Sequence, residues 1–322
     1  MRMPEPDQKT IAEKPRLAAA LTQLLGAEGL ITDGVALRAY ETDGLTAYRQ
    51  PPLFVALPRS TAEVATVLRF CPEHGVKVVP RGAGTSLSGG ALPLADGALL
   101  GLGKLNRILE IDIANRCAVV QPGVTNLAIS HAVAAAGYYY APDPSSQIAC
   151  SIGGNVAENS GGVHCLKYGL TTNNLLGLEF VTIEGEVIRL GGKHLDYAGY
   201  DLMGILTGSE GLLGVVTEVT VRLLRRPETA KALVAGFPSN EQAGAAVAAI
   251  IGAGIIPAGM EMMDRPAIHA AEDFVHAGYP LDAEALLIVE LDGPTVECDH
   301  LLQKVSEICT ANGAAGLRVS RD

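Results

Sequence analysis

The sequence predicts an α+β protein built from two domains. A chain of 322 residues can bury two ordinary cores, since one domain typically uses about 100–200 residues. Hydrophobic residues make up 48% and charged residues 18%, a balance typical of folded chains. Segments with strand and helix patterns are mixed and often joined as hairpins, which favours an α+β fold over a strictly alternating parallel one.

The first predicted elements lead directly into a glycine-rich segment. An Ala- and Leu-rich helix is expected near residues 16–25, and "LFVALP" at 53–58 reads as a buried strand. Ser60 and Glu63 then form a capping box, because each side chain can satisfy a free backbone N–H of the next helix. A second strand, "VKVVP" at 76–80, runs straight into "PRGAGTSLSGG".

The remaining elements alternate between strands and helices. Near Glu184 and Gly185 the pattern predicts a hairpin over 178–190. A helix is expected over 125–137, closed by Gly137. Further strands are predicted at 98–102, 108–113, 117–124 and 214–224.

A domain boundary is predicted near "RRPETAK" at 225–231, where charge and proline interrupt the apolar pattern. The expected organisation is an N-terminal helical segment over 1–50, a first domain over 51–226 and a second over 227–322. Strands and helices alternate in the second domain, which predicts an open sheet with helices on one face. The pattern stops at "GLRVSRD", so we expect this domain to be incomplete.

Composition excludes several classes of protein. The formal net charge of −11 argues against a nucleic-acid surface, which needs clustered Lys and Arg. No apolar stretch is long enough to span a bilayer, and the N-terminus lacks a secretory signal, so a soluble intracellular protein is expected. None of the cysteines has Cys-x-x-Cys spacing, which predicts buried or half-buried thiols and no metal or iron–sulfur site in this chain.

Three glycine-rich segments are the candidate site. The first, from Gly82 to Gly90, follows a strand, where bare amides can bind an anion. It is not a Rossmann fingerprint, because Leu87 stands where the third glycine would be. It is not a P-loop either, since Gly90 replaces the lysine. A turn suited to a pyrophosphate remains, with a tight surface turn as the alternative.

The other two segments are "APDPSSQIACSIGGNVAENSGGVHCLKYG", at 141–169, and "TGSEGLLGVVTEVTV", at 207–221. The first of these combines stiffening prolines with glycines, small side chains and amides. A flat ring laid along exposed backbone would need that composition. A structural glycine-rich loop is the alternative for both segments.

In this order and spacing, the three segments resemble the FAD-binding domain of the vanillyl-alcohol oxidase-type flavoproteins, also called the PCMH-type domain. Within that superfamily the chain is most similar to the FAD-binding subunits of bacterial glycolate oxidases, close kin of D-lactate and D-2-hydroxyglutarate dehydrogenases. The resemblance implies a two-subdomain PCMH-type FAD-binding domain followed by a truncated α+β substrate (cap) domain.

The resemblance also assigns cofactor-binding residues. The first segment should wrap the pyrophosphate of FAD, the second should line the flavin, and the third should close over the ribityl and adenosine portion. The residues carried over are Arg81, Gly82, Ala83, Gly84, Thr85, Ser86, Pro142, Asp143, Cys150, Ser151, Gly153, Gly154, Asn155, Asn159, Gly162, Glu210, Gly211, Val215 and Val216. Relatives with a covalent flavin commonly carry a histidine where this chain has Thr85, which implies non-covalent FAD.

The implied reaction is oxidation of glycolate or a related D-2-hydroxy acid to the 2-oxo acid, with hydride passing to the flavin. Electrons would then pass to partner subunits, namely a second FAD-domain chain and an iron–sulfur chain. By the same resemblance, the protein would be cytoplasmic and associated with the inner membrane through those partners.

The catalytic base is not defined by this sequence. His164 is the candidate in the second segment, although it also suits a packed, hydrogen-bonded histidine; His131, His269 and His276 read as structural. In relatives, the substrate-side histidines belong to an "H-x-x-G-D-G-N"-like motif, expected beyond residue 322. We therefore expect this chain to bind FAD with little turnover. The alternative is an FAD-binding but non-catalytic assembly subunit.

Overall fold

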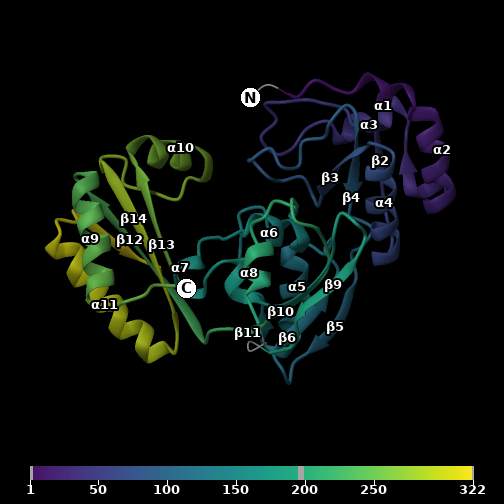
Figure 1. Cartoon of the computed structure of the whole chain (residues 1–322). Coiled ribbons are helices and arrows are strands. Elements are labelled where there is room, and N and C mark those ends of the chain that lie inside the picture. Colours follow the sequence, from purple (N-terminus) through teal and green to yellow (C-terminus); the bar gives the residue numbers. More distant parts are fainter. Residues whose placement is uncertain (1–2, 195–198, 321–322) are drawn as a thin grey trace. The chain divides into compact units, whose positions relative to one another are not determined.

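The computed structural model describes residues 3–194 and 199–320, which form two compact units (Figure 1). Unit 1 consists of residues 1–160 and 170–224, and unit 2 of residues 161–169 and 225–322. The division between residues 224 and 225 lies two residues from the boundary that the sequence predicts between residues 226 and 227. The sequence does not predict that residues 161–169 belong to unit 2.

Unit 1 contains a mixed sheet with the strand order β1-β2-β4-β3. Strands β2 and β3 both run parallel to β4, whereas β1 pairs with β2 in the antiparallel sense. Helix α4 (Thr61–Glu73) connects β2 to β3 and packs into the hydrophobic core beside the sheet. The strands are β1 (Leu30–Ile31), β2 (Phe54–Ala56), β3 (Lys77–Arg81) and β4 (Gly97–Gly101).

The start of α4 confirms the predicted cap in a modified form. The Ser60 side chain accepts a hydrogen bond from the N–H of Glu63 at 3.2 Å. The Glu63 carboxylate accepts one at 2.7 Å from the N–H of Arg59, one residue before the cap. The first interaction satisfies a donor that a helix start leaves free, and the second satisfies the N–H just before the cap.

A second sheet in unit 1 is antiparallel, with the order β5-β6-β10-β8-β9. Strands β8 and β9 form the hairpin that the sequence predicts, and β10 lies at the centre of the sheet. The strands are β5 (Ile108–Asp112), β6 (Cys117–Val120), β8 (Leu175–Val181), β9 (Val187–Gly191) and β10 (Val215–Arg222). Two separate sheets, each with its own core, make unit 1 a pair of subdomains.

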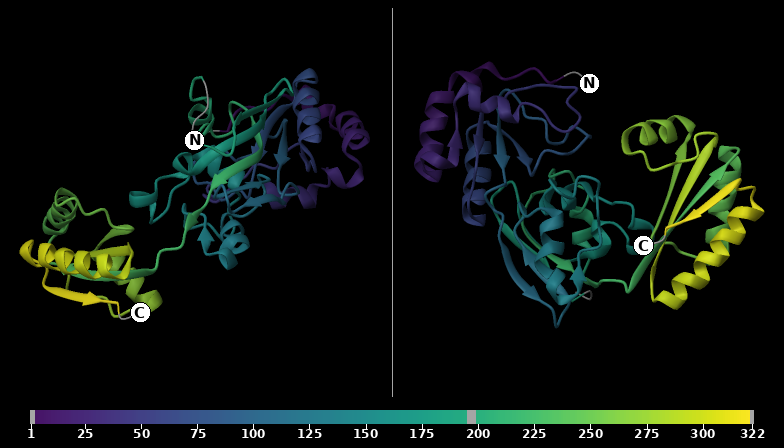
Figure 2. Two further views of the ribbon diagram at one scale, coloured as in Figure 1. Left: turned by 90° about the horizontal axis from the view of Figure 1, so that it is seen from below. Right: turned by 180° about the vertical axis from the view of Figure 1, so that it is seen from behind.

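Unit 2 is built on an antiparallel sheet with the order β13-β14-β12-β15. Its strands are β12 (Thr229–Phe237), β13 (Gly259–Asp264), β14 (Ala285–Gly293) and β15 (Gly316–Val319). Helices α9 (Asn240–Gly252) and α11 (Thr295–Ala311) pack on the face that carries Leu287 and Val289 (Figures 1 and 2).

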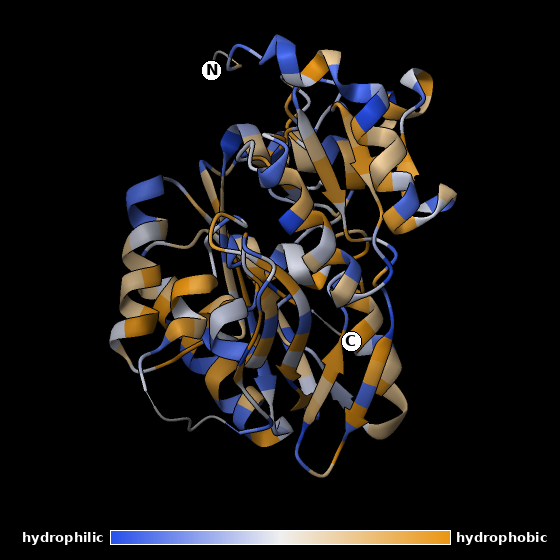
Figure 3. Cartoon of the chain, turned by 45° about the vertical axis from the view of Figure 1, so that its right-hand side comes forward, coloured by the Kyte–Doolittle hydropathy of each residue, from blue (hydrophilic) through white to orange (hydrophobic). Residues whose placement is uncertain are grey.

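The prediction that all helices of this sheet lie on one face is wrong for α10 (Arg265–Val275). Ile268 of α10 packs with Leu286, whose side chain points to the face opposite Leu287 because successive residues of a strand alternate. In Figure 3 hydrophobic residues dominate the strands, while the helices carry both hydrophobic and hydrophilic residues.

The remaining elements are short or lie at the edges of these layers. The further helices are α1 (Gln8–Ala12), α2 (Lys14–Leu25), α3 (Gly34–Leu37), α5 (Asn126–Val133), α6 (Ile152–Glu158), α7 (Cys165–Tyr168) and α8 (Leu202–Leu206). Short 3-10 helices cover Ala27–Gly29, Arg38–Tyr40, Ala134–Ala136 and Thr171–Asn174, and the two-residue strands are β7 (Tyr138–Tyr139) and β11 (Leu224–Arg225). Among the helices described, none is both long and apolar enough to cross a bilayer.

The cysteines are buried or half-buried, as predicted. Five are buried, and Cys165 has intermediate exposure. Cys71 is completely buried in the core beside α4, and this burial raises the pKa of its thiol to about 12. The folded protein therefore favours the neutral thiol over the thiolate at this position.

This burial predicts a loss of stability in alkaline solution. Between the ordinary thiol pKa of 9.0 and about 12, the folded state keeps a proton at Cys71 that the unfolded state releases. The free energy of unfolding should therefore fall as the pH rises above about 9. Urea denaturation of wild type and Cys71→Ala across this range measures the effect. The variant should show a shallower fall, whereas the control Cys165→Ala should keep the wild-type slope.

Candidate functional site

Unit 1 contains a cavity of about 250 Å³, formed where the three glycine-rich segments meet. One wall is the loop that follows β3, from Arg81 to Ala91. A second wall is helix α6 with the residues just before it. The third is the segment from Leu206 to Val216, which leads into β10, and Phe180 of β8 adds an apolar ring.

Most of the predicted cofactor residues line this one cavity. They are Arg81, Gly82, Ala83, Gly84, Thr85, Ser86, Cys150, Ser151, Gly153, Gly154, Asn155, Glu210, Gly211, Val215 and Val216. Pro142, Asp143 and Asn159 belong to unit 1 but are not among the lining residues, and Gly162 belongs to unit 2.

The middle of the second segment is a helix, not the exposed loop that its glycines suggested. Ser151 is the N-cap of α6, and its side chain accepts a hydrogen bond from the N–H of Gly154. Ile152 and Val156 are buried one turn apart and anchor the helix to the core. Asn159 ends the helix in the left-handed conformation, with φ of 51°, so its role here is a C-cap.

The two glycines of α6 are required for different reasons. A Cβ on Gly153 would lie 2.5 Å from the Cβ of Pro122, so the protein's own packing excludes a side chain there. A Cβ on Gly154 would meet one atom within 4 Å, the Ser151 Oγ at 3.2 Å. Because Gly154 also lines the cavity, its missing side chain leaves space for a ligand.

The loop after β3 offers hydrogen-bond donors to the cavity. Gly84 has a φ of +73°, and a Cβ there would lie 2.2 Å from the guanidinium of Arg81. Glycine is therefore needed both for the backbone conformation and for the contact with Arg81. Within residues 3–194 and 199–320, no group accepts a hydrogen bond from the main-chain N–H of Ala83, Gly84 or Thr85. Such amides in a tight turn suit an anion.

Arg81 is the cationic side chain of the cavity. Among its lining residues, all of which the structure describes, the charged ones are Arg81, Glu158 and Glu210. Arg81 Nη1 donates a hydrogen bond to the carbonyl oxygen of Tyr40 at 3.0 Å. Burial lowers the pKa of the guanidinium, and the negative charge of Asp43 opposes that shift. The side chain stays charged because arginine is protonated throughout the ordinary pH range.

Glu158 lines the cavity and was missed by the sequence reasoning. Its carboxylate accepts hydrogen bonds from Ser86 Oγ at 2.9 Å and from Ser88 Oγ at 3.1 Å. These contacts join the end of α6 to the loop after β3. Glu158 could have been predicted from the sequence if α6 had been recognised as a helix. It follows Gly154 by four residues and therefore lies on the same face of the helix.

The third segment is attached to α6 by main-chain hydrogen bonds. The N–H of Gly208 donates to the carbonyl of Val156, and the N–H of Glu210 donates to that of Ala157, both at 2.8 Å. The last carbonyls of a helix lack partners within the helix, so these bonds satisfy them while fixing the segment.

Pro142 is connected to α6 by two side-chain hydrogen bonds. Its carbonyl accepts a hydrogen bond from Asn126 Nδ2 at 2.8 Å, and Asn126 Oδ1 accepts one from Asn155 Nδ2 at 2.8 Å. Asn126 and Asn155 are both buried, so this relay holds the first turn of α6 in place. Pro142 therefore acts on the cavity wall through two asparagines.

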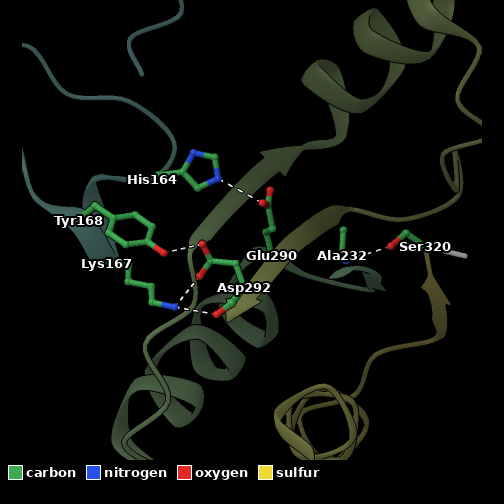
Figure 4. Close-up of polar contacts among 7 residues, drawn as sticks. All are labelled: His164, Lys167, Tyr168, Ala232, Glu290, Asp292 and Ser320. Atoms are coloured by element: carbon green, nitrogen blue, oxygen red, sulfur yellow. Dashed lines mark hydrogen bonds and ion pairs between the residues drawn. The ribbon is translucent and has the colours of Figure 1, made fainter. Parts of the chain in front are cut away.

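His164 lies in unit 2, on the segment 161–169, and is not among the residues that line the cavity. Its Nε2 is 3.2 Å from the Glu290 carboxylate, and Lys167 and Tyr168 both point to Asp292 (Figure 4). Lys167 Nζ donates to the Asp292 carbonyl at 2.8 Å. These contacts fix the segment to β14 of unit 2.

The arrangement suits an anionic ligand that carries a flat ring. One end of the cavity offers a cation and main-chain amides; glycines, apolar side chains, serines, Asn155 and the carboxylates of Glu158 and Glu210 form most of the rest of its surface. In the described part of the chain, no group of three or more His, Cys, Asp or Glu residues is arranged to hold a metal ion.

Comparison with known families agrees with this chemistry. A family model described as "FAD binding domain" matches residues 52–191, and one described as "FAD linked oxidases, C-terminal domain" matches residues 226–322.

Similar curated proteins include two glycolate oxidase subunits. The subunit GlcD of Escherichia coli (strain K12) is 53% identical over 320 residues, which are 99% of this chain and 63% of that protein. GlcD of Bacillus subtilis (strain 168) is 42% identical, over 94% of this chain and 64% of its own. A D-lactate dehydrogenase of Archaeoglobus fulgidus is 37% identical, over 74% of this chain and 53% of its own. The chain thus spans less than two thirds of the length of these relatives.

Solved structures show the same fold at low identity. An alkyldihydroxyacetonephosphate synthase matches with a TM-score of 0.81 and 21% identity, over 99% of this chain and 62% of its own. A p-cresol methylhydroxylase with substrate bound matches with a TM-score of 0.82 and 18% identity, over 98% of this chain and 67% of its own. The predicted mixed α+β, PCMH-type fold is therefore confirmed.

The two glycines of α6 give a matched pair for testing the packing. Gly153→Ala should lower the free energy of unfolding by about 1–3 kcal/mol, because the new methyl group overpacks against Pro122. Gly154→Ala should change it by less than about 1 kcal/mol, since alanine favours the helix and Ser151 can rotate away. Urea denaturation without added FAD measures both. Equal losses in the two variants would contradict this account of Gly153.

Proposed function

Since the chain belongs to the FAD-linked oxidases, we propose that it binds FAD in the cavity of unit 1 and oxidises glycolate or a related D-2-hydroxy acid. The observation that carries the proposal is the meeting of three glycine-rich segments around one half-buried arginine. The strong similarity to glycolate oxidase subunits supports the substrate class. D-Lactate dehydrogenases among the relatives support a 2-hydroxy acid more generally.

The cavity residues fit the parts of FAD. Arg81 and the amides of Ala83 to Thr85 would hold the pyrophosphate, because they combine the cavity's positive charge with unpaired donors. The open surface over Gly154 would admit the isoalloxazine ring, and Val215 and Val216 would cover the adenosine side. Thr85 supports a non-covalent cofactor.

The chain's contribution to the reaction is binding and orientation. FAD, when bound, supplies the two-electron acceptor. The anchored loops fix where the cofactor lies, and the buried wall behind α6 keeps water from that side. Cys150 lines the cavity as a buried free cysteine.

We also propose partners and a place in the cell. The relatives are named as subunits, which supports an assembly of several chains. The proposed partners are a second FAD-domain chain and an iron–sulfur chain that accept the electrons. The protein would be cytoplasmic and held at the inner membrane through those partners.

The proposed activity is tested by flavin reduction without oxygen, because a single reduction of the bound FAD can be observed even where turnover is low. We expect the FAD-loaded protein to lose its visible flavin absorption when glycolate or D-lactate is added, and to respond more slowly to L-lactate. Stopped-flow absorbance measures the rates. A protein that binds FAD but stays oxidised with every 2-hydroxy acid would contradict the proposal and support a non-catalytic FAD-binding subunit.

The proposed position of the ring is tested by Gly154→Leu. The leucine side chain would fill the space left open beside α6, so FAD affinity should fall by at least about 100-fold, given 1.4 kcal/mol per tenfold. Titration of flavin fluorescence measures it, with Gly244→Leu on the exposed surface of α9 as the control, since a Cβ there meets nothing within 4 Å. Unchanged flavin occupancy would remove Gly154 from the proposed contact surface.

A further inference from the structure

We propose that the N-terminal segment from Tyr40 to Gly44 supports FAD binding by positioning Arg81 and the loop over residues 84–86. The inference rests on the proposed function, because it assigns residues to the same cavity. The segment lies outside residues 52–191, which the FAD binding domain model matches. None of its residues lines the cavity, so the proposed role is positioning, not contact with FAD.

The segment contacts the loop at both ends. At the start, the Tyr40 carbonyl accepts the hydrogen bond from Arg81 Nη1 at 3.0 Å. Further along, the N–H of Gly44 donates to the Ser86 carbonyl at 3.1 Å. The loop that offers free amides to the cavity is therefore held from outside by a separate part of the chain.

Gly44 shows how closely the two segments pack. A Cβ there would lie 2.7 Å from the Thr85 carbonyl oxygen and 3.0 Å from its carbonyl carbon. Both are main-chain atoms, so the loop itself would have to move to accept a side chain. The main-chain amides of Ala83 to Thr85 would move with it, away from the positions that a pyrophosphate would use.

Asp43 places a buried carboxyl group in this segment. It is 4% exposed, and its Oδ1 accepts a hydrogen bond from the N–H of Leu45 at 3.1 Å. Its buried Oδ2 has no hydrogen-bond partner among the described residues. A buried carboxylate in this state is costly unless a positive charge lies near.

Arg81 supplies a positive charge that Asp43 favours. The hydrogen bond to the Tyr40 carbonyl oxygen keeps the guanidinium beside the loop. The Tyr40 carbonyl oxygen accepts a hydrogen bond from one N–H of the Arg81 guanidinium. The other N–H groups of the guanidinium can therefore donate to a phosphate group.

The steric test is Gly44→Ala, with Gly34→Ala as the matched control. Gly34 lies in the same N-terminal region, and a Cβ there meets nothing within 4 Å. We expect Gly44→Ala to weaken FAD binding by about tenfold or more, because the loop that carries the amides must move to accept the new methyl group. Gly34→Ala should stay within about twofold. Riboflavin, which lacks the pyrophosphate, should bind both variants as it binds wild type. Fluorescence titration measures both flavins.

The electrostatic test is Asp43→Asn, with Asp33→Asn as its control. Asp33 makes the same local contact, accepting from the N–H two residues ahead at 3.1 Å, but it is exposed. Asp43→Asn should weaken FAD binding and spare riboflavin, and Asp33→Asn should do neither. In the Arg81→Gln background, Asp43→Asn should cause no further loss, because the two residues act as one unit.

The outcomes separate this inference from the proposed function. If wild type fails to bind FAD, the proposed function fails. If wild type binds FAD and both Gly44→Ala and Asp43→Asn bind it equally well, the inference alone is overturned. It is also overturned if riboflavin affinity falls as much as FAD affinity. If Gly44→Ala unfolds at a lower temperature than wild type without FAD, its loss of affinity could reflect stability alone. The double-mutant cycle of Asp43→Asn and Arg81→Gln then tests the inference: a further loss of FAD affinity in the double variant would overturn it.

Discussion

The cavity depends on hydrogen bonds and contacts that converge on one short helix, α6. Ser151 caps its start, and Asn155 joins it to the Asn126 relay. At its end, Val156 and Ala157 hold the third glycine-rich segment, while Glu158 holds the first through two serine hydroxyls. A shift of this helix would therefore move every wall of the cavity at once. The two glycines in its first turn let it lie against Pro122 on one side and leave the cavity open on the other.

Much of the fold could be predicted from local sequence signals. The strand ending at Arg81, the cap at Ser60 and the hairpin around Gly185 each rest on neighbouring residues, so their patterns appear in the sequence. Helix α6 was missed because two glycines, each unfavourable in a helix by about 0.5–1 kcal/mol, hid the spacing of Ile152 and Val156. The Ser151 cap and the packing of Ile152 and Val156 in the core outweigh that cost.

The site was less predictable where it depends on contacts between distant parts of the chain. Tyr40 contacts Arg81 across some forty residues of sequence, and no periodicity marks such a contact. Gly162 was assigned to the cofactor by its neighbours in sequence, yet the chain enters unit 2 just before it. The polar contacts of Lys167 and Tyr168 with Asp292 explain why this segment belongs with β14.

The charges of the cavity show how an acidic chain could hold an anionic cofactor. With a net charge of −11, the protein offers no general attraction to phosphate, so recognition must be local. Two carboxylates, Glu158 and Glu210, face the same cavity as Arg81. Ser86 and Ser88 donate hydrogen bonds to Glu158, which moderates its charge and keeps those hydroxyls from a phosphate. In the proposed site the pyrophosphate would then be left to Arg81 and the bare amides beside it, and the affinity would depend on the contacts that keep that one guanidinium in place.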